Sequence, residues 1–306
     1  MMKLPILLKR IYIILKNLPD RKFRRHFFTY VYQRFIIRNY QYKQQIILTG
    51  LPRSGTTLLY NMLTFALPFY SSDPDEYHAK SSLIYDENHL TKNFVDMFHI
   101  KQLNEYNIYN KKIIFIIQIR DIRDIITSIH HNVPDDYFIG YANRYSPGGI
   151  ENVKGGVPPR FIEQGLRDYM AGIATIKSSN YPSIVVNYED FITNPDDAQL
   201  LIENFINQSL QASLSEYHNH PDRIVLKNEE ARDQTLVRHT QAITTSRIAK
   251  WKNPIHAERI KDQFTHYPEL FSLLETLGYE TDRAWFDAFI INDNNDQRKS
   301  RRDEML

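Results

Sequence analysis

The stretch Gln44–Leu59, QQIILTGLPRSGTTLL, decides the fold class of this chain. It joins a short apolar run to a turn that contains Gly50 and Gly55, and two threonines, Thr56 and Thr57, follow. The glycine spacing is that of a nucleotide P-loop, G-x-x-x-x-G-K-[ST], but Thr56 stands where that pattern has its lysine. The sequence therefore predicts a phosphate-binding turn between a strand and a helix, with a ligand other than a magnesium-bound triphosphate.

Strand and helix patterns alternate around this turn. Apolar runs predict strands over 46–49, 113–119 and 183–188. Helical spacing predicts helices over 56–67, 123–131, 161–179 and 196–207, with a long Gly- and Pro-rich loop over 132–160. This alternation predicts an α/β fold: a mostly parallel central sheet with helices on both faces, similar to P-loop NTPases, and extra helices at both ends.

Three segments are expected along the chain. Residues 1–43 form a basic helical N-terminal segment, residues 44–290 a single α/β domain, and residues 291–306 a polar tail that we expect to be disordered. The 306 residues are 42% hydrophobic and 24% charged, which is ordinary for a soluble globular protein. The chain has no Cys, which excludes disulfides, thiolate metal sites and a Cys nucleophile.

Charge is distributed unevenly. The first 43 residues hold eleven Lys or Arg and one acid, a formal charge of +10, which leaves −8 for the remainder of a chain whose total is +2. Bases interrupt the apolar run of this segment, so it fits neither a membrane span nor a secretory signal. Two interpretations stay open: a packed helix with a solvated basic face, or a helix that contacts an anionic membrane or an acidic substrate. We expect a cytoplasmic protein, with peripheral membrane contact through this segment as the second interpretation, and no nucleic-acid partner.

Two basic side chains stand where phosphates would bind. Arg53 lies in the middle of the turn, and its guanidinium can donate to two anionic oxygens at once. After the second apolar strand comes Arg-Asp-Ile-Arg-Asp, and an arginine at a strand end, here Arg120, favours a second phosphate over a metal. A nucleotide that carries phosphates at both its 5′ and 3′ positions would use both.

With these residues in view, the sequence resembles the sulfotransferases that use 3′-phosphoadenosine-5′-phosphosulfate (PAPS), and among them a bacterial carbohydrate-type member. Four motifs carry the resemblance, in the family's order: Pro52–Thr57 (PRSGTT), Arg120–Ser128 (RDIRDIITS), Tyr188–Asp190 (YED) and the segment SRIAKWKN at 246–253. The first two motifs together are specific, and the other two corroborate them.

The resemblance implies PAPS as the co-substrate, adenosine 3′,5′-bisphosphate (PAP) as the product, and no metal. It assigns the 5′-phosphosulfate to Arg53, Ser54, Gly55, Thr56 and Thr57, and Arg53 also takes part in catalysis. It assigns the 3′-phosphate to Arg120 and Ser128, the adenine side to Tyr188, and a loop that closes over the nucleotide to Arg247, Lys250 and Trp251.

A general base must also accept the proton of the acceptor hydroxyl. The loop after the first helix, SSDPDEYHAK, offers Glu76 as first choice and His78 as second. Related enzymes that act on proteins and some carbohydrates use a glutamate in about this place, and small-molecule members use a histidine.

The acceptor is expected to be a saccharide or glycolipid, with a phenol left open. The aromatics Tyr137, Phe138, Tyr141 and Tyr145 would suit stacking on sugar rings, or else pack among themselves. Two other functions remain: a small-molecule P-loop kinase, which would need a magnesium site, and a nucleotide-binding module without catalysis.

Overall fold

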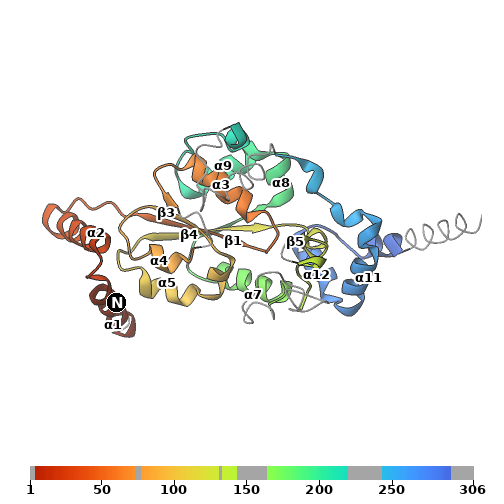
Figure 1. The fold of residues 1–306 in the computed structure, drawn as a ribbon, viewed down its shortest axis with the longest axis horizontal. Coiled ribbons are helices and arrows are strands. Elements are labelled where there is room, and N and C mark those ends of the chain that lie inside the picture. The colour runs from red at the N-terminus through yellow and green to blue at the C-terminus, as the bar shows by residue number, and fades with distance from the viewer. Residues whose placement is uncertain (1–3, 73–76, 131–132, 143–163, 220–242, 291–306) are drawn as a thin grey trace, which may run out of the picture. The chain divides into compact units, whose positions relative to one another are not determined.

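The computed structural model describes residues 4–72, 77–130, 133–142, 164–219 and 243–290, and Figure 1 shows their elements. The chain forms two compact units. The first comprises Met1–Ile119 and Ala171–Thr244, and the second comprises Arg120–Met170 and Thr245–Leu306. The sequence had predicted a single domain over 44–290. The loop over 132–160 is described only up to residue 142, and the tail over 291–306 lies outside the described residues.

A five-stranded parallel sheet forms the centre of the first unit. Its strands are β1 (Gln44–Gly50), β2 (Ser71–Ser72), β3 (His89–Lys92), β4 (Lys112–Ile119) and β7 (Ser183–Asn187). They lie in the order β2-β3-β1-β4-β7, and each neighbouring pair is parallel. Because the chain runs from β1 to β2 and β3 on one side and then returns to β4 on the other, the loop that follows β1 lies at a topological switch point.

Helices cover both faces of this sheet. The first unit contains α1 (Leu4–Asn17), α2 (Arg21–Val31), α3 (Thr56–Ala66), α4 (Ala79–Ser82), α5 (Ile100–Tyr106), most of α7 (Leu166–Lys177), α8 (Tyr188–Thr193) and α9 (Pro195–Ile206), with a π-helix η1 (Tyr32–Ile37) and 3-10 turns η2 (Phe94–Phe98) and η5 (Leu214–Asn219). Figure 1 shows α3, α8 and α9 over one face and α4, α5 and α7 over the other. Seven of the eight residues of β4 are buried, as expected for a strand covered on both faces. The predicted α/β fold is confirmed.

The second unit is mostly helical. It contains α6 (Ile122–Ile126), the antiparallel pair β5 (Ile129–His130) and β6 (Val133–Tyr137), the 3-10 turns η7 (Thr245–Arg247), η8 (Lys250–Lys252) and η9 (Pro254–His256), α11 (Ala257–His266), α12 (Glu269–Leu277) and a helix over 284–290. Aromatic rings form its core: Trp285 packs edge-on against Phe264 at 5.0 Å and against Trp251 at 5.4 Å between ring centroids.

Two predicted boundaries are wrong. The helix expected over 123–131 ends at Ile126, because the Thr127 hydroxyl donates to the carbonyl of Arg123 (2.7 Å) and the Ser128 carbonyl accepts from the backbone of Phe138 (2.9 Å). The Ser128 carbonyl thereby has a partner outside a continuing helix, whereas the Arg123 carbonyl also accepts a helical hydrogen bond from the N–H of Thr127 (3.2 Å). The strand expected over 183–188 ends at Asn187, and Tyr188 begins α8.

Candidate functional site

The turn between β1 and α3 is tied to the neighbouring strand β4. The backbone N–H of Leu51 donates to the carbonyl of Gln118 at 3.1 Å. Ser54 is fully buried, and its hydroxyl lies 2.6 Å from the Leu51 carbonyl and 3.2 Å from the Gln118 carbonyl. The N–H of Ser54 donates back to Leu51 as well, at 3.2 Å. Ser54 therefore braces the turn in a tight shape, and both of its donors act within the turn.

Gly55 is required at the start of α3 for two reasons. Its φ of +90° lies in the left-handed region, where a side chain is strained. A Cβ at this position would lie 2.6 Å from the ring of Tyr188, which is buried at the start of α8. Tyr188, expected on the adenine side, thus packs directly against the backbone of the turn and supports it.

The N-terminus of α3 points its backbone donors out of this turn. The Gly55 carbonyl accepts from the N–H groups of Leu58 (2.9 Å) and Leu59 (3.2 Å), so Thr56 and Thr57 precede the first hydrogen bonds inside the helix. The first N–H groups of a helix have no intrahelical acceptor and carry partial positive charge, which makes such a terminus an anion site. Arg53 precedes it with a φ of +63° and a half-buried side chain.

A lysine that lies outside the sequence motif, on another strand, contacts the turn. Lys92, the last residue of β3, is buried, and its ammonium donates to the hydroxyl of Thr57 at 3.0 Å. In the P-loop pattern Thr57 occupies the position whose hydroxyl ligates Mg²⁺. Here an ammonium holds that hydroxyl. Sequence reasoning missed Lys92 because the short, polar strand His89–Lys92 gives no hydrophobic signal.

Gln118 on β4 adds an unpaired polar group beneath the turn. Its side chain is fully buried, and neither amide atom has a hydrogen-bond partner among the described residues. Its Nε2 lies 3.5 Å from the position that a Cβ of Gly55 would take. Buried amides are nearly always satisfied by protein, water or ligand. An unpaired amide directly under the turn fits a site that binds a polar ligand.

A histidine–aspartate pair lies close to the same sheet edge. His78 Nδ1 lies 3.1 Å from one carboxylate oxygen of Asp96, and the other oxygen accepts from the N–H of Ala79 at 3.0 Å. Asp96 is buried and follows β3, whereas the His78 side chain is 36% exposed. A buried carboxylate that accepts from Nδ1–H leaves Nε2 to accept a proton. Glu76, the other candidate base, lies outside the described residues.

Asp124 organises the predicted nucleotide residues of the second unit. Its carboxylate accepts from the backbone N–H groups of Ala249 and Trp251, each at 3.0 Å, and from the guanidinium of Arg120 at 3.0 Å. The same guanidinium donates to the carbonyl of Arg247. The structure thus brings Arg120 together with the segment around Arg247, and a buried carboxylate that was not singled out in the sequence holds them there.

The remaining predicted residues of this unit differ in burial. Ser128 is half-buried after α6, and the side chains of Arg247 and Lys250 are exposed. Trp251 is buried, and the guanidinium of Arg123 lies 4.1 Å from its ring centre. The position of Trp251 is therefore that of a core residue of the second unit.

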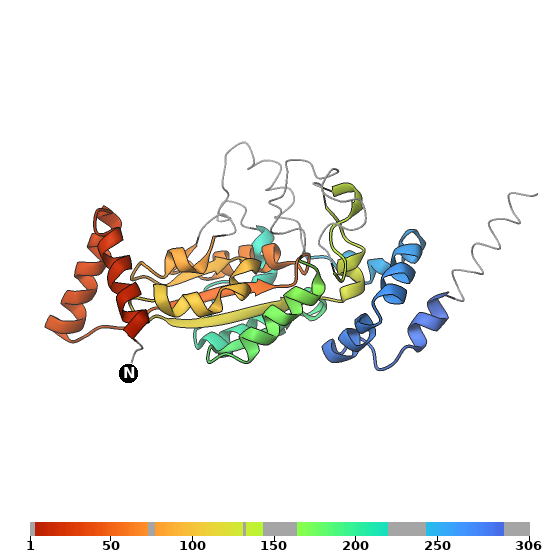
Figure 2. The same cartoon turned by 90° about the horizontal axis from the view of Figure 1, so that it is seen from below.

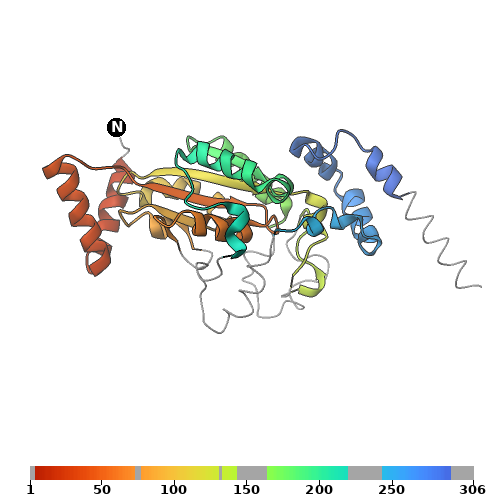
Figure 3. The ribbon, with the colours of Figure 1, turned by 90° about the horizontal axis from the view of Figure 1, so that it is seen from above.

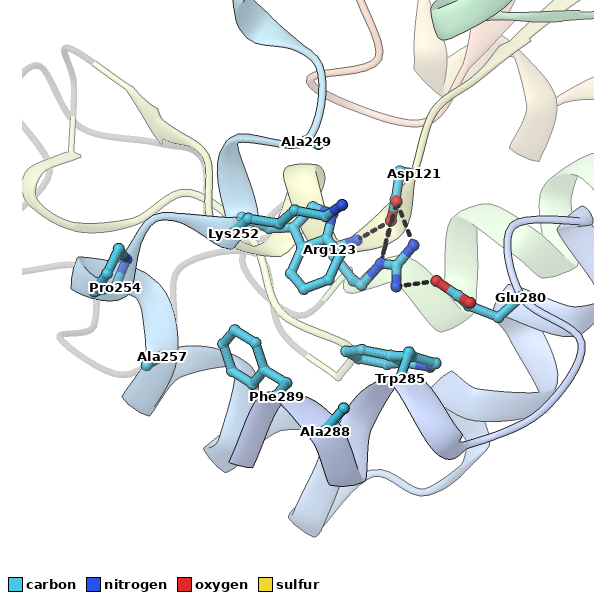
Figure 4. Close-up of a pocket in the computed structure, with 11 residues that line it drawn as sticks. Asp121, Arg123, Ala249, Lys252, Pro254, Ala257, Glu280, Trp285, Ala288 and Phe289 are labelled. Carbon is cyan, nitrogen blue, oxygen red and sulfur yellow. Dashed lines mark hydrogen bonds and ion pairs between the residues drawn. The ribbon is translucent and has the colours of Figure 1, made fainter. Parts of the chain in front are cut away.

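Trp251 lines a cavity of about 480 Å³. Figure 4 is a close-up of the residues around this cavity. Trp285 and Phe289 form its apolar wall, and Arg123 crosses it to pair with Asp121 (2.7 Å) and with Glu280. The guanidinium of Arg123 thereby occupies the space between two indole rings, at 4.1 Å and 4.6 Å from their centres. The predicted anion ligands Arg120, Ser128, Arg247 and Lys250 are not part of its lining.

The described loop aromatics pack within the protein. The Tyr137 hydroxyl lies 3.2 Å from Nδ1 of His256, and Tyr141 packs against Tyr267 with 5.2 Å between ring centroids. Phe138 is buried. Tyr145, the fourth aromatic considered for sugar stacking, lies outside the described residues.

No family model matches this chain, and no curated protein matches it. Solved structures do match, among them one described as "Sulfotransferase Domain from the Curacin Biosynthetic Pathway". It has 16% sequence identity, covers 74% of this chain and 98% of that chain, and gives a TM-score of 0.45.

Proposed function

We propose that this chain is a PAPS-dependent sulfotransferase that moves a sulfuryl group to a hydroxyl or amine. The contact between Lys92 and Thr57 carries the proposal. A P-loop kinase needs the hydroxyl at the Thr57 position for Mg²⁺, and here it accepts a hydrogen bond from an ammonium at 3.0 Å. A fixed cation at this position supports binding of a phosphate ester without a metal ion.

The turn would hold the 5′ end of the donor. Hydrogen bonds to the oxygens of its 5′-phosphosulfate would come from Arg53, from the N–H groups at the start of α3 and from the hydroxyls of Thr56 and Thr57. The 3′-phosphate assigned to Arg120 and Ser128, and the closing role assigned to Arg247 and Lys250, remain proposals that rest on the motifs. Absence of a metal from the reaction is part of the same proposal.

The proposed reaction is a direct displacement at sulfur. The acceptor oxygen forms a bond to sulfur while the bond between sulfur and the 5′-phosphate oxygen breaks, and that oxygen keeps the electron pair. Arg53 and Lys92 would stabilise the negative charge that develops there, and loss of one such donor typically costs about 10²–10³-fold in rate.

We propose His78 as the base that takes the acceptor proton. Its pairing with the buried Asp96 is the arrangement that orients a catalytic imidazole and stabilises its protonated form. Glu76 remains the alternative, and the tests below separate the two. For the acceptor we retain a saccharide or glycolipid as a proposal, with a phenol as the other choice.

A transfer assay with sulfur-labelled PAPS and a panel of sugar, glycolipid and phenol acceptors tests this function. We expect label on an acceptor in the presence of EDTA, and loss of that activity in Lys92→Met and Arg53→Met. Phosphoryl transfer from ATP that requires Mg²⁺ would identify the kinase instead. Binding of PAP without transfer to any acceptor would favour the non-catalytic module.

A further inference from the structure

Helix α1 carries an apolar face that nothing in the described structure covers. Figures 2 and 3 show α1 and α2 at one end of the sheet of the first unit. Five aliphatic side chains of α1 are exposed, by 41–65%: Leu4, Leu7, Leu8, Ile11 and Leu15. Their spacing of three and four residues places them on one face of the helix, within an arc of about 100°. We call this face the α1 stripe.

The opposite face of α1 is the one that packs. Ile13 is buried, and Arg10, one turn before it, donates to the carbonyl of Asn104 (2.8 and 3.1 Å) and to the side chain of Asn110 (3.0 Å). These contacts hold the helix on the loop and helix around α5. The contacts of Ile13 and Arg10 fix the orientation of α1, and the α1 stripe on the opposite face is left exposed.

Basic residues accompany the α1 stripe. Tyr12 borders it and is exposed, and Lys9 and Lys16 lie one helical turn to either side of Tyr12, with the Lys9 ammonium 5.8 Å from its ring centre. Helix α2 adds exposed bases at Arg21 and Arg25. The first 43 residues hold eleven bases and a single acid, Asp20. Asp20 is used as the N-cap of α2, where it accepts from the N–H of Phe23 at 2.6 Å. The segment thus combines exposed aliphatic side chains with more positive charge than its single acid balances.

More apolar surface follows on the same segment. Five side chains after the middle of α2 are exposed by 53–68%: Phe28, Tyr32, Phe35, Ile36 and Ile37. Exposed apolar side chains in this number, mixed with bases, are rare on a surface that meets only water. No helix among the described residues is long and apolar enough to cross a bilayer.

We propose that the α1 stripe docks this protein on an anionic lipid bilayer, with α1 lying in the plane of the interface. Aliphatic side chains enter the acyl boundary, and Lys9, Lys16 and the bases of α2 contact anionic headgroups. The charge argues for lipid over a second copy of this chain, since two segments of +10 would repel each other. This inference is independent of the proposed sulfuryl transfer, because bilayer binding needs no donor.

Cosedimentation of the full chain with vesicles tests the proposal. We expect binding to phosphatidylcholine vesicles that contain about one-third phosphatidylserine, weak binding to phosphatidylcholine alone, and release by salt. The triple variant Leu7→Gln/Ile11→Gln/Leu15→Gln should bind at least about 100-fold more weakly. The matched control Leu200→Gln/Leu201→Gln changes exposed leucines of α9 and should bind like the parent protein.

A charge variant separates headgroup contact from apolar insertion. Lys9→Gln/Lys16→Gln should weaken binding to anionic vesicles by roughly 30-fold, about fivefold for each base. The control Lys112→Gln/Lys177→Gln removes two exposed lysines elsewhere in the same unit and should have no effect. Circular dichroism of each variant verifies the fold.

The absence of Cys allows a direct measurement of insertion. An environment-sensitive fluorophore on Ile11→Cys should shift to the blue with anionic vesicles, and the same label on Leu200→Cys should not. Unchanged binding by the triple variant, no binding by the parent protein, or a dimer in solution that the triple variant dissociates would each overturn the proposal.

Discussion

The ammonium of Lys92 lies 3.0 Å from the hydroxyl of Thr57, across the gap between the end of β3 and the start of α3. Parallel pairing of β1 with β3 accounts for this contact, since it places Lys92 beside Leu48, two residues before the turn begins. The turn keeps the glycine spacing of a P-loop, with Arg53 inside it and the ammonium of Lys92 on the hydroxyl of Thr57.

Gly55→Ala should damage the turn between β1 and α3. The added methyl must displace the Tyr188 ring or the turn itself, so we expect PAP affinity to fall by at least about tenfold and stability to fall by more than 1 kcal/mol. The control is Gly278→Ala, which has a similar φ of +79° and no atom within 4 Å of the added methyl. It should cost only about 1 kcal/mol and leave PAP binding unchanged. Equal effects of the two variants would show that Tyr188 does not support the turn.

Asp96→Asn should impair catalysis and spare donor binding. If Asp96 orients His78 and stabilises its protonated ring, kcat falls by about 10²–10⁴-fold while PAP affinity stays constant. Asp262→Asn is the control, because Asp262 pairs with His266 at 3.0 Å on the exposed surface. His78→Gln and Glu76→Gln complete the set. Full activity in His78→Gln together with an inactive Glu76→Gln would assign the base to Glu76.

Asp124→Asn should destabilise the protein. An amide nitrogen cannot accept from the N–H groups of Ala249 or Trp251, and the buried guanidinium of Arg120 no longer faces a negative charge at position 124. We expect a loss of about 3 kcal/mol in urea denaturation. Asp282→Asn changes an exposed carboxylate that accepts one N–H, from Ala284 at 2.8 Å, and should cost less than about 0.5 kcal/mol. A neutral Asp124→Asn would contradict the organising role of this carboxylate.

Lys111 should make stability rise with pH. Burial lowers the pKa of its ammonium to about 7 in the folded chain, against 10.5 as its ordinary value. Between these two values the unfolded chain binds a proton that the folded chain has released. Raising the pH from 7 to 9 therefore stabilises the parent protein relative to Lys111→Met, by up to about 1.4 kcal/mol per pH unit. Urea denaturation of both proteins at several pH values measures this slope, and identical pH profiles would refute it.

The sequence predicted the sheet and the turn because both depend on strong local signals. The apolar runs in β1 and β4 and the glycines of the turn are visible without the fold. Lys92 and Asp96 were missed, since each acts on a residue at least 18 positions away and comes from the short polar strand β3 or the turn after it. Asp124 was visible in its motif, but its role depends on backbone N–H groups 125 and 127 residues later.

The helical spacing of the sequence also predicted a helix that is too long, because hydrogen bonds to residues far along the chain end it early. The spacing of Arg123–His131 suits a helix, yet the carbonyl of Ser128 pairs with Phe138 and β5 follows α6. The resemblance assigned Trp251 to a loop that closes over the nucleotide, and the contacts of its indole with Arg123 and Trp285 were not visible in the sequence. A single sequence does not distinguish such partners, because the competing contacts lie far along the chain.

Titration calorimetry with PAP, in EDTA and again with excess Mg²⁺, tests most directly whether Lys92 takes the place of a metal. We expect equal affinity in both conditions, an affinity lowered by about 10–100-fold in Lys92→Met, and no change in Lys111→Met, which neutralises another buried lysine of the first unit. Binding that requires Mg²⁺, prefers ATP and is indifferent to Lys92→Met would contradict the account.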